Sequence, residues 1–550
     1  MESQRNLLLI ALLVVSYLLF EQWQVDNAPA APQTTTIESN KQTSKDSVSE
    51  DFIPESSDNT KPSSIVKAVN TANLVEVKTD VLTIKINTQG GDIVEAQLLK
   101  YDTELDNGIP IRLLQNGQFK HIAQSGLTGA NGLDRLIKGR PIYQSAEKNY
   151  QFSDDQQTLV VDLIYIDSKA LSVTKRFTFS RDSYDIKVDY IIKNNMTTNA
   201  SVQLYAQLKQ TVNIPKSSSM MPTSAYRGAA YSTSEDLYEK YDFDDIKEQP
   251  LNMVTKGGWV AMIQHYFVSA WVPQQDSENQ LYSSYTSNGD AVIGFKAPTL
   301  IIEPHTEKTA SAILYIGPKD QDEMAKLAPG LDLTIDYGFL WMISQPLFWL
   351  LVQIHSLVGN WGIAIIVITL IVKGGMYPLT KVQYTSMAKM RELQPKIAAL
   401  KERFGDDRQK MSKAMMDMYK KEKVNPAGGC LPLLLQMPIF LALYWVFLES
   451  VELRHAPFML WIQDLSAKDP YYILPILMGI SMYVMQKMQP MTIQDPMQQK
   501  MMQYMPVFFT IFFFWFPSGL VLYWLVSNII SIVQMKIIFA GIEKKKKAKE

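Results

Sequence analysis

The residue with the clearest capacity for chemistry is Lys373, a cation within a long apolar run. Residues 361–377 are apolar except for Thr369 and Lys373, and Thr369 lies one helical turn earlier on the same face. A cation held in hydrocarbon attracts acidic groups, whereas a lysine near the end of a membrane span can simply extend its ammonium to the interface. Position alone favours the second interpretation, which gives Lys373 no special role.

Polar side chains in other apolar runs favour the first interpretation. Gln436 lies six residues into the next run, and Ser527 and Asn528 lie in the last run, 520–538. Because each polar group would be costly alone in hydrocarbon, several of them at similar depth indicate a shared wet cavity. The sequence therefore predicts a polar site between helices, with Lys373 as its charge.

Several other kinds of chemistry find no support in the sequence. Cys430 is the only cysteine, the five histidines lack metal-ligand spacing, and no GxxxxGK[ST], HExxH or GxSxG motif occurs. This argues against a nucleotide-driven pump, a zinc protease and a serine hydrolase, and predicts no metal, no cofactor and no enzymatic reaction. The 53 basic and 55 acidic residues give a net charge of −2, which argues against DNA as a partner.

The N-terminal region predicts a membrane anchor followed by a tether. Residues 7–20 are almost entirely apolar, with Arg5 before them and Trp23 after them. We expect residues 1–27 to form an uncleaved transmembrane anchor, with a cleavable signal peptide as the alternative. Residues 28–70 are rich in small and polar side chains and have almost no aromatic ones, which predicts a disordered tether.

Residues 71–330 predict β structure. Leu82, Ile84 and Ile86 alternate with polar residues, the same alternation recurs over residues 186–190, and Asn-Gly and Gly-Gly turns separate such runs. A stretch of this length predicts a large antiparallel sandwich. No group of carboxylates or histidines in it indicates catalysis, and we expect its acidic residues to lie on the solvent-facing sides of the strands.

Residues 331–540 predict helices in or along a membrane. The part 331–358 is apolar but broken by polar residues and proline, which favours a helix lying in the membrane interface. The part 359–540 predicts a bundle of five spans, at residues 361–377, 431–448, 472–485, 504–516 and 520–538. Two of these spans cover only about 20 Å of a hydrocarbon core of about 30 Å. Either their polar flanks extend the helices, or the bilayer is thinner around the bundle.

Basic residues set the expected orientation. The loop 378–430 contains twelve Lys and Arg, the loop 449–470 has two against four acidic residues, and the tail 541–550 contains a run of four lysines. The positive-inside rule therefore places both termini and the loop 378–430 in the cytoplasm, and the β domain outside. With the anchor included, the fold class is a polytopic α-helical membrane bundle of six transmembrane helices with a large all-β sandwich outside.

The loop 378–430 predicts two antiparallel helices, because apolar residues recur at three- and four-residue steps on both sides of a central break. The apolar faces are rich in methionine, including Met387, Met390, Met411 and Met415. Such faces adapt to many partners, which suits a docking arm. They also serve to pack the two arms of a hairpin together, and both interpretations stay open.

Longer motifs carry a resemblance to a known family. The matching motifs are Tyr377-Pro378-Leu379-Thr380, Gln383-Tyr384-Thr385-Ser386-Met387-Ala388-Lys389-Met390, Leu393-Gln394-Pro395-Lys396, Val424-Asn425-Pro426, Gly428-Gly429-Cys430, Gln436-Met437-Pro438-Ile439-Phe440, Phe516-Pro517-Ser518-Gly519-Leu520 and, in the β part, Gly257-Gly258-Trp259-Val260-Ala261. With these motifs the chain resembles the YidC membrane-protein insertase family in its long Gram-negative form. The likeness covers nearly all of the chain outside residues 28–70.

The resemblance implies an insertase and chaperone of membrane proteins in the bacterial inner membrane, with a periplasmic β domain. Helices of this family enclose a hydrophilic groove, open to the cytoplasm and to lipid, in which a positive charge attracts the polar segment of a substrate. That charge is usually arginine; Lys373 occupies its place here and keeps the charge without the bidentate fork. Thr369 matches a substrate-contacting threonine, and Trp524, preceded by Tyr523, matches an aromatic residue of the groove.

The expected groove residues and partners follow from this likeness together with the polar positions above. The groove residues are Lys373, Thr369, Gln436, Trp524, Tyr523, Ser527 and Asn528. The implied partners are nascent membrane proteins, the Sec translocon with its accessory subunits, and membrane lipids. The lysines of the tail 541–550 predict an electrostatic contact with the ribosome, with a simple stop-transfer anchor as the alternative.

Two other functional classes are weighed against the insertase. A transporter or channel with a polar midplane site usually shows internal repeats, and the two halves of the predicted bundle show none. A membrane-anchored periplasmic carbohydrate-binding protein is suggested by the β domain, which resembles the supersandwich of sugar-binding proteins. That class leaves Lys373, Gln436 and the loop 378–430 without a role.

Overall fold

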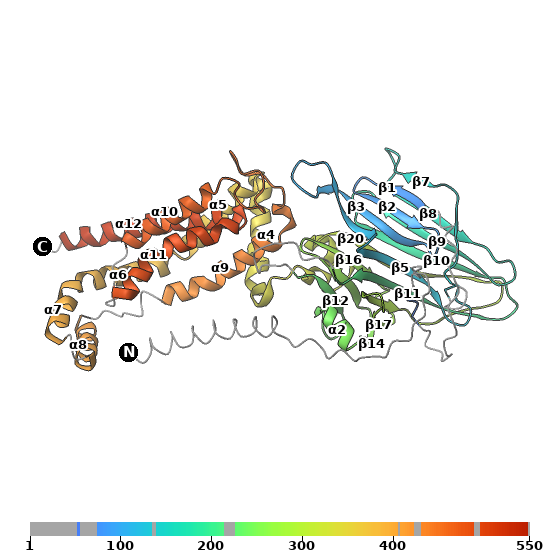
Figure 1. The fold of residues 1–550 in the computed structure, drawn as a ribbon, viewed down its shortest axis with the longest axis horizontal. Helices are drawn as coiled ribbons and strands as arrows, with labels where there is room; N and C mark the ends of the chain where they lie inside the picture. Colours follow the sequence, from blue (N-terminus) through green and yellow to red (C-terminus); the bar gives the residue numbers. More distant parts are fainter. Residues whose placement is uncertain are drawn as a thin grey trace, which may run out of the picture.

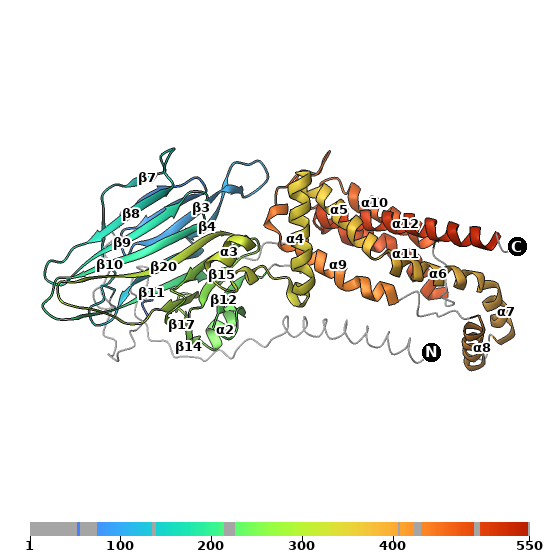
Figure 2. The same cartoon turned by 180° about the vertical axis from the view of Figure 1, so that it is seen from behind.

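A β-sandwich and a helical bundle lie end to end in the computed structural model of the protein (Figure 1). The structure describes residues 52–54, 74–134, 139–213, 226–404, 408–422, 431–488 and 496–547. The predicted anchor 1–27 and nearly all of the predicted tether 28–70 lie outside the described residues. The transverse helix α4 (Trp341–Val358) lies between the sandwich and the bundle (Figure 2).

The sandwich consists of two large sheets. Within the described residues, one sheet has eleven strands, in the order β14-β17-β18-β11-β5-β4-β3-β2-β1-β7 with β19 also paired to β11. Its strands are β1 (Leu74–Lys78), β2 (Leu82–Asn87), β3 (Asp92–Asp102), β4 (Pro110–Asn116), β5 (Lys120–Thr128), β7 (Asn149–Gln151), β11 (Ala200–Thr211), β14 (Asn252–Lys256), β17 (Glu278–Tyr285), β18 (Asp290–Lys296) and β19 (Leu300–Ile302).

The second sheet has nine strands in the described residues, in the order β13-β12-β15-β16-β20-β10-β9-β8-β6. They are β6 (Gln144–Ser145), β8 (Thr158–Tyr165), β9 (Leu171–Ser180), β10 (Asp185–Asn194), β12 (Gly228–Ser232), β13 (Glu239–Tyr241), β15 (Trp259–Ile263), β16 (Phe267–Val272) and β20 (Glu307–Pro318). Two short helices, α2 (Phe243–Glu248) and α3 (Gln321–Leu327), complete this part.

The predicted sandwich is confirmed by the burial pattern of its strands. In β2, Leu82, Ile84 and Ile86 are buried while the residues between them are only partly so. The described strand pairs are antiparallel except for β1 with β7. Side chains of both sheets form one apolar core, because alternate residues of each strand point to the same face.

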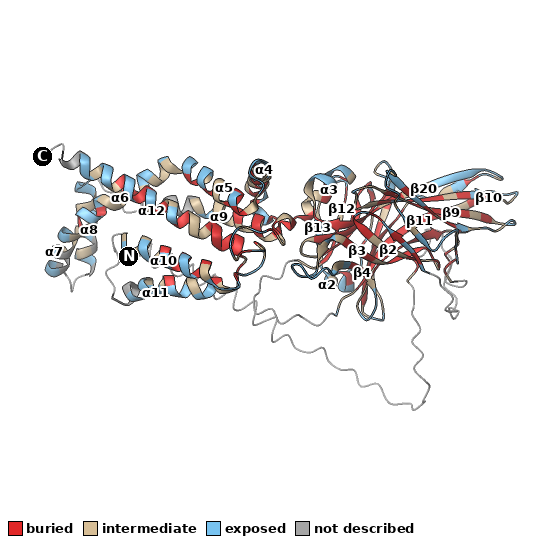
Figure 3. Ribbon diagram, turned by 90° about the horizontal axis from the view of Figure 1, so that it is seen from above, coloured by how far each residue is buried: buried red, intermediate tan, exposed pale blue. Residues whose placement is uncertain are grey.

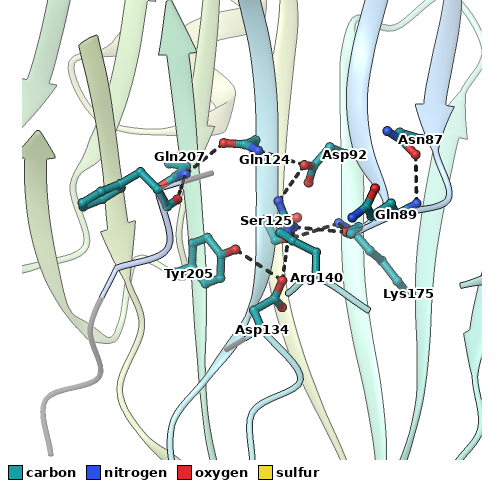
Figure 4. A network of polar contacts seen from close by, with 12 residues as sticks. Asn87, Gln89, Asp92, Gln124, Ser125, Asp134, Arg140, Lys175, Tyr205 and Gln207 are labelled. Carbon is teal, nitrogen blue, oxygen red and sulfur yellow. Dashed lines mark hydrogen bonds and ion pairs between the residues drawn. The ribbon is translucent and has the colours of Figure 1, made fainter. Parts of the chain in front are cut away.

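Charged residues between the strands contradict the prediction that acidic groups lie on solvent-facing sides. Asp92 and Asp134 are buried on the two sides of Arg140, which donates from Nη1 to Asp92 Oδ2 at 2.6 Å and from Nε to Asp134 Oδ1 at 2.7 Å (Figure 4). Lys175 lies beside them, fully buried, and its Nζ donates to the backbone oxygens of Gly90 and Ser125. Strand alternation cannot reveal this cluster, because its members come from β3, β9 and the connection between β5 and β6.

The stability of the sandwich is expected to rise with pH above neutrality because of Lys175. Burial lowers the pKa of Lys175 to about 7, with Arg140 adding to the effect and Asp92 and Asp134 opposing it. Between pH 7 and the ordinary lysine pKa of 10.5 the unfolded chain therefore binds more protons than the folded chain, so the free energy of unfolding increases with pH. From pH 7 to pH 9 we expect the unfolding temperature to rise by roughly 3–8 °C.

The measurement is thermal unfolding of the full chain at pH 7 and pH 9, with Lys175→Met beside the wild type. The variant is expected to lose the rise, whereas the control Lys169→Met, at an exposed lysine, keeps it. Below pH 7 His121 adds its own dependence, because burial lowers the pKa of its imidazole to about 4. A rise in Lys175→Met equal to that of the wild type would contradict the assignment.

The helical part begins with two short 3-10 turns, Leu331–Thr334 and Gly338–Leu340, followed by α4. The other helices are α5 (Trp361–Gly375), α6 (Tyr377–Glu392), α7 (Gln394–Phe404), α8 (Arg408–Lys421), α9 (Leu431–Glu449), α10 (Ile473–Met488), α11 (Pro496–Phe512) and α12 (Ser518–Lys547). Five of them, α5 and α9 to α12, correspond to the five predicted spans. The helix α4 runs across the ends of these helices rather than along them (Figure 2).

The loop 378–430 differs from the predicted pair of helices, since its described residues form three. Helix α6 follows α5 after a bend of 65° at Met376, and its Tyr384 packs against Met535 and Ile538 of α12. A second break falls at Leu393, because Pro395 lacks the N–H that would continue the hydrogen-bond ladder. Residues 378–392 of the predicted cytoplasmic hairpin are thus part of the bundle, and of the described hairpin helices only α7 and α8 extend beyond it (Figure 1).

Two helix ends also differ from the prediction. Helix α11 begins at Pro496, eight residues before the predicted start at Tyr504, so its polar flank extends the helix as the first of the two alternatives assumed. Helix α12 continues through Lys547, so most of the predicted tail 541–550 is the last part of this helix. At a rise of 1.5 Å per residue, the 30 residues of α12 reach about 45 Å.

The sandwich and the bundle share a buried interface. One apolar cluster contains Val268 and Ala270 of the sandwich together with Leu351 of α4 and Leu443 of α9. Lys319, next to the end of β20, forms an ion pair at 3.2 Å with Glu449 at the end of α9, and both side chains are buried. Further hydrogen bonds join the two parts, from the ring of His265 to Leu448 O and from Arg454 to Thr103 O. These contacts hold the sandwich directly against the bundle.

Candidate functional site

Lys373 lies at the contact between α5 and α12, near the end of α5 that leads into α6. Its side chain is 6% exposed, and its Nζ donates to Ser531 Oγ at 3.0 Å. From the other direction, Gln534 Nε2 donates to the backbone oxygen of Lys373 at 3.1 Å. Two side chains of α12 thus contact one residue of α5, which fixes the ammonium against the last helix.

The polar residues of α12 follow helical spacing. Ser527, Ser531 and Gln534 occupy positions i, i+4 and i+7 and form one buried face toward α5. Asn528 points to the neighbouring helix α10, where its Nδ2 donates to Ser481 Oγ at 3.0 Å. We call the buried residues Lys373, Ser481, Ser527, Asn528, Ser531 and Gln534 the polar seam.

Three members of the polar seam were missed by the sequence reasoning: Ser481, Ser531 and Gln534. The spacing of Ser531 and Gln534 relative to Ser527 was visible in the sequence and could have identified them. Ser481 carries no such signal, because its contact with Asn528 spans 47 residues of sequence. Only the packing of α10 against α12 brings that serine to the seam.

The polar seam carries a net positive charge. Among the described residues no carboxylate lies within ion-pair distance of Lys373, and the one hydrogen bond of its ammonium goes to a neutral hydroxyl. Gln534 Oε1 is buried and accepts no hydrogen bond from the described part of the chain. An unneutralised cation beside an unsatisfied acceptor favours the entry of water or of an acidic, hydrogen-bonding segment.

Thr369 lies on the face of α5 that packs into the bundle, and it is fully buried. Its hydroxyl donates to Ile365 O at 2.6 Å, four residues earlier in the same helix. In this arrangement Thr369 closes a hydrogen bond within α5, so it offers no free donor to the polar seam.

Tyr523 and Trp524 lie in an aromatic cluster apart from the polar seam. The Trp524 ring lies 4.6 Å from the rings of Phe440 of α9 and Phe513 of the short 3-10 turn after α11, in edge-to-face geometry. Tyr523 is buried against Phe440 and Phe447. Gln436 is half-buried on α9, and in the described part of the chain no hydrogen bond joins it to Lys373. The structure therefore divides the predicted groove residues into a polar group and an aromatic group.

An apolar hollow of about 610 Å³ opens where α4, the α5–α6 bend and α9 meet. Its lining residues are Ile343, Gly375, Met376, Pro378, Leu379, Pro438 and Ile439. The hollow lies close to Lys373 in the chain, since Gly375 follows it by two residues. The C-terminal end of α5 thus contributes Lys373 to the nearly closed polar seam and Gly375 to the open apolar hollow.

The predicted methionine faces pack against each other and against the bundle. Met390 and Leu393 are buried together with Met387, Met418 and Tyr419, which joins α6 to α8. Met411 and Met415 are half-buried on α8. For Met387 and Met390 the geometry fits internal packing of the hairpin, while Met416 on α8 is exposed.

Within the described residues, no group of three or more His, Cys, Asp or Glu side chains could hold a metal ion. By length and composition, two described helices can cross a membrane, Gly338–Val358 and Ser518–Lys544, and the bent pair formed by Trp361–Gly375 and Tyr377–Ile397 makes a third. Shorter apolar helices run over Gln436–Glu449 and Ile473–Met488. The six transmembrane helices of the predicted fold class are therefore not all visible by this test.

The outer faces of the bundle are apolar as well as exposed. Figure 3 shows much exposed surface along the bundle helices, in contrast to the buried centre of the sandwich. Exposed side chains on α10, α11 and α12 include Ile480, Val507, Phe508, Ile529 and Val533. Exposed apolar side chains on several helices favour a lipid or protein environment over water. The fold and the site thus define a helical membrane protein with a large β domain at one end and a buried cation between its helices.

The comparisons with known proteins identify the family. Residues 74–350 match the family described as YidC periplasmic domain, and residues 353–546 match the family described as 60Kd inner membrane protein. The chain is 56% identical to "Membrane protein insertase YidC" of Shewanella pealeana and 54% identical to the protein so named in Aeromonas hydrophila subsp. hydrophila, over 99% of both chains in each case. A solved structure described as "Active YidC insertase crystal structure with the first transmembrane domain resolved" is 21% identical over 86% of this chain and 94% of its own, with a TM-score of 0.37.

The chain belongs to the YidC family of membrane protein insertases. It is an inner-membrane protein with a periplasmic β-sandwich, and proteins of this kind are not enzymes. The resemblance seen in the sequence motifs is confirmed.

Proposed function

We propose that this protein inserts nascent membrane proteins through the polar seam, with Lys373 attracting the polar part of the substrate. The observation that carries the proposal is a buried cation with no carboxylate partner among the described residues. A charge in this state is costly unless it meets an anion or water, so an acidic segment gains free energy on reaching it. The neutral side chains around Lys373 can form hydrogen bonds with the backbone of the substrate, and these bonds are weak enough to let the substrate move on.

The free energy of insertion comes from the substrate rather than from a nucleotide. Burying the apolar span of a substrate releases about 0.8 kcal/mol per CH₂ group. The membrane potential adds about 2.3 kcal/mol per charge per 100 mV for acidic residues that move outward. The role of Lys373 is to lower the barrier at the start of this movement, while the apolar hollow beside α9 accepts the hydrophobic part of the substrate.

The polar seam must open for a chain to enter it, because its side chains are nearly fully buried. The bend between α5 and α6 lies next to Lys373, and its Gly374 and Gly375 have open space around them. A change in this bend moves α6 relative to α12 and widens the contact that covers Lys373. Such an opening gives the hydrophilic groove, open to cytoplasm and lipid, that the family resemblance implies.

We further propose six transmembrane helices with both termini in the cytoplasm. This topology is supported by the position of α7, α8 and the end of α12, which lie at the end of the bundle opposite the sandwich (Figure 1). Their basic residues fit the cytoplasmic side of a membrane. The domains proposed are an anchor at 1–27, a tether at 28–70, the sandwich at 71–330, the transverse interfacial helix within 331–358, the bundle at 359–540 and a basic terminus at 541–550.

The proposed partners are nascent chains, the Sec translocon and the ribosome. Lys544 is exposed near the end of α12, in the segment that carries the run of lysines. Lysines on a helix that extends away from the bundle suit a contact with ribosomal RNA, which weakens steeply with salt.

Photo-cross-linking to a stalled nascent membrane protein tests the proposal. A photoreactive residue at Ser531 leaves the charge of Lys373 in place and is expected to cross-link the nascent chain. The matched control is Val533, which lies on the opposite face of α12 and is 50% exposed. A probe at Lys544 is expected to cross-link the ribosome at low salt only, and Sec subunits identified in the same reactions report the third partner.

The outcomes separate the functional classes. Equal cross-linking from positions 531 and 533 contradicts insertion through the polar seam, because it indicates general contact with lipid-exposed surface. A transporter or channel predicts no cross-link to nascent chains from either position. Cross-linking of the nascent chain from position 531, without a ribosome product from position 544, supports insertion through the polar seam and contradicts the ribosome contact.

A further inference from the structure

Three residues of the predicted tether lie on the sandwich, although the tether was expected to be disordered. Ile53 is 7% exposed, Pro54 is buried and Phe52 is partly buried. The Phe52 ring lies 6.3 Å from the ring of Tyr282 on β17. The flanking residues 51 and 55 are outside the described residues, so the contact is assigned to residues 52–54 alone.

The surface beneath this segment is a single row of residues across four strands. Gln124 of β5 pairs with Gln207 of β11, Gln207 pairs with Gly294 of β18, and Gly294 pairs with Tyr282 of β17. A Cβ atom on Gly294 would lie 2.7 Å from the Tyr282 hydroxyl and 2.7 Å from Gln207 Cβ. The missing side chain at Gly294 thus lets the Tyr282 ring lie across β18 and reach Gln207.

The side-chain amide of Gln207 hydrogen-bonds to the backbone of the segment. Its Nε2 donates to Phe52 O at 2.9 Å and to Gln124 Oε1 at 3.0 Å, while its Oε1 accepts from the Tyr282 hydroxyl at 2.7 Å. Gln124 in turn donates to Asp92 Oδ2 at 2.9 Å (Figure 4). This chain of hydrogen bonds fixes the orientation of the Gln207 amide, so that one of its N–H groups points out of the sheet.

The Gln207 N–H that donates to Phe52 O indicates that the contact is specific. With the segment in place Gln207 is fully buried, and its side-chain amide makes three hydrogen bonds, of which the one to the Phe52 carbonyl depends on the segment. Without the segment, this N–H of Gln207 loses its protein acceptor, and the apolar side chains of the segment return to water, which is unfavourable. The tether matches this requirement, because Phe52 is the only aromatic residue between 28 and 70 and Pro54 favours an extended backbone at Ile53.

We propose that this face of the sandwich is a peptide-binding site whose ligand is the chain's own residues 52–54. The bound segment acts as a strap that fastens the tether to the sandwich. It shortens the free chain between the predicted anchor and the sandwich by about half, which restricts how far the anchor moves from the bundle. In this site Gln207 donates a hydrogen bond to a peptide carbonyl, and Tyr282 contacts an aromatic ring. The site also buries the two apolar residues that follow, Ile53 and Pro54.

Limited proteolysis of the full chain tests the strap. Chymotrypsin cleaves after aromatic residues, so Phe52 is its expected site within residues 28–70, whereas trypsin reports the rest of this segment at Lys41 and Lys45. Cleavage follows the population in which the strap has left the site. We expect the bond after Phe52 to be cut about tenfold or more slowly than in a free peptide of residues 46–60, since tenfold corresponds to only about 1.4 kcal/mol.

Variants on both sides of the contact identify its cause. Ile53→Ser leaves the sandwich unaltered, and Gln207→Leu removes the donor; both are expected to bring cleavage close to that of the matching free peptide. The control is Gln203→Leu, on the same strand and face, whose amide donates to Ala297 O at 2.8 Å and does not contact the tether. It is expected to keep Phe52 protected.

Three results would overturn the proposal. These are cleavage of the wild-type chain at the rate of the free peptide, protection that persists in Ile53→Ser, and a loss of protection in Gln203→Leu as large as in Gln207→Leu. The last result would assign the protection to the general stability of the sandwich. Ile53→Ser decides the matter even if Gln207→Leu fails to fold, because its substitution lies outside the sheets.

Discussion

Replacing Lys373 by glutamate is expected to abolish most insertion of substrates whose translocated segment is acidic. At 4 Å near a protein–water boundary, a glutamate at position 373 would repel an acidic residue of the substrate by up to about 4 kcal/mol. The native lysine attracts the same acidic residue by a similar amount. Lys373→Ala removes the attraction without adding repulsion, so its defect is smaller. Lys373→Arg keeps the charge and is expected to preserve insertion, since Ser531 can still accept a hydrogen bond from the longer side chain.

The measurement uses two substrates that differ only in acidic residues of the translocated segment. Each is inserted in membranes that contain the wild type, the three variants or the control Lys536→Ala, with protein level and topology checked in every case. Lys536 lies on the same helix as Ser531 and is exposed, so its loss reports the effect of removing an ordinary lysine of the bundle. Equal defects for both substrates in Lys373→Ala would show that Lys373 acts only as a helix-end anchor.

Breaking the ion pair between sandwich and bundle is expected to destabilise the whole chain. Lys319 and Glu449 are both buried and lie 3.2 Å apart, so Lys319→Met leaves a buried carboxylate without its partner. Removal of one member of such a pair typically costs about 3–5 kcal/mol, whereas replacing both by apolar residues of similar size is often close to neutral. We therefore expect Lys319→Met and Glu449→Met to be much less stable than the double variant.

Thermal unfolding of the four proteins in the same detergent or lipid provides this comparison. The matched control is Lys326→Met, whose salt bridge with Glu323 is exposed to solvent and is expected to contribute little to stability. If the double variant is as unstable as the less stable single variant, the interface requires the ion pair itself. In that case the cost of one unpaired buried charge does not explain the loss of stability.

The elements of this protein could largely be predicted from the sequence, because their signals are local. Alternation at Leu82, Ile84 and Ile86 identifies a half-buried strand without knowledge of its partner. Long apolar runs identify α5 and α9 to α12 in the same way. Boundaries were less certain where polar residues continue a helix, as at the start of α11, or where a proline interrupts one, as between α6 and α7.

The candidate site could be predicted only in part. The sequence identified Lys373 as an unusual cation, because its neighbours in the chain are apolar. It grouped Lys373 with Trp524 and Gln436, whereas the structure sets the aromatic cluster apart and brings Ser531, 158 residues away, to the ammonium. A helix presents several faces, and the sequence of one helix does not say which neighbour covers each of them.

By itself, the sequence determined the β-sandwich, the apolar helices and the membership in the insertase family, since each depends on patterns within a segment. Tertiary structure decided which charges are buried, which helix covers Lys373, and where the sandwich meets the bundle. It also placed Phe52 on Gln207, a contact between residues 155 positions apart. The physical reason is that buried polar groups are tolerated only where a partner meets them, and in this chain those partners come from distant segments brought together by packing of the apolar core.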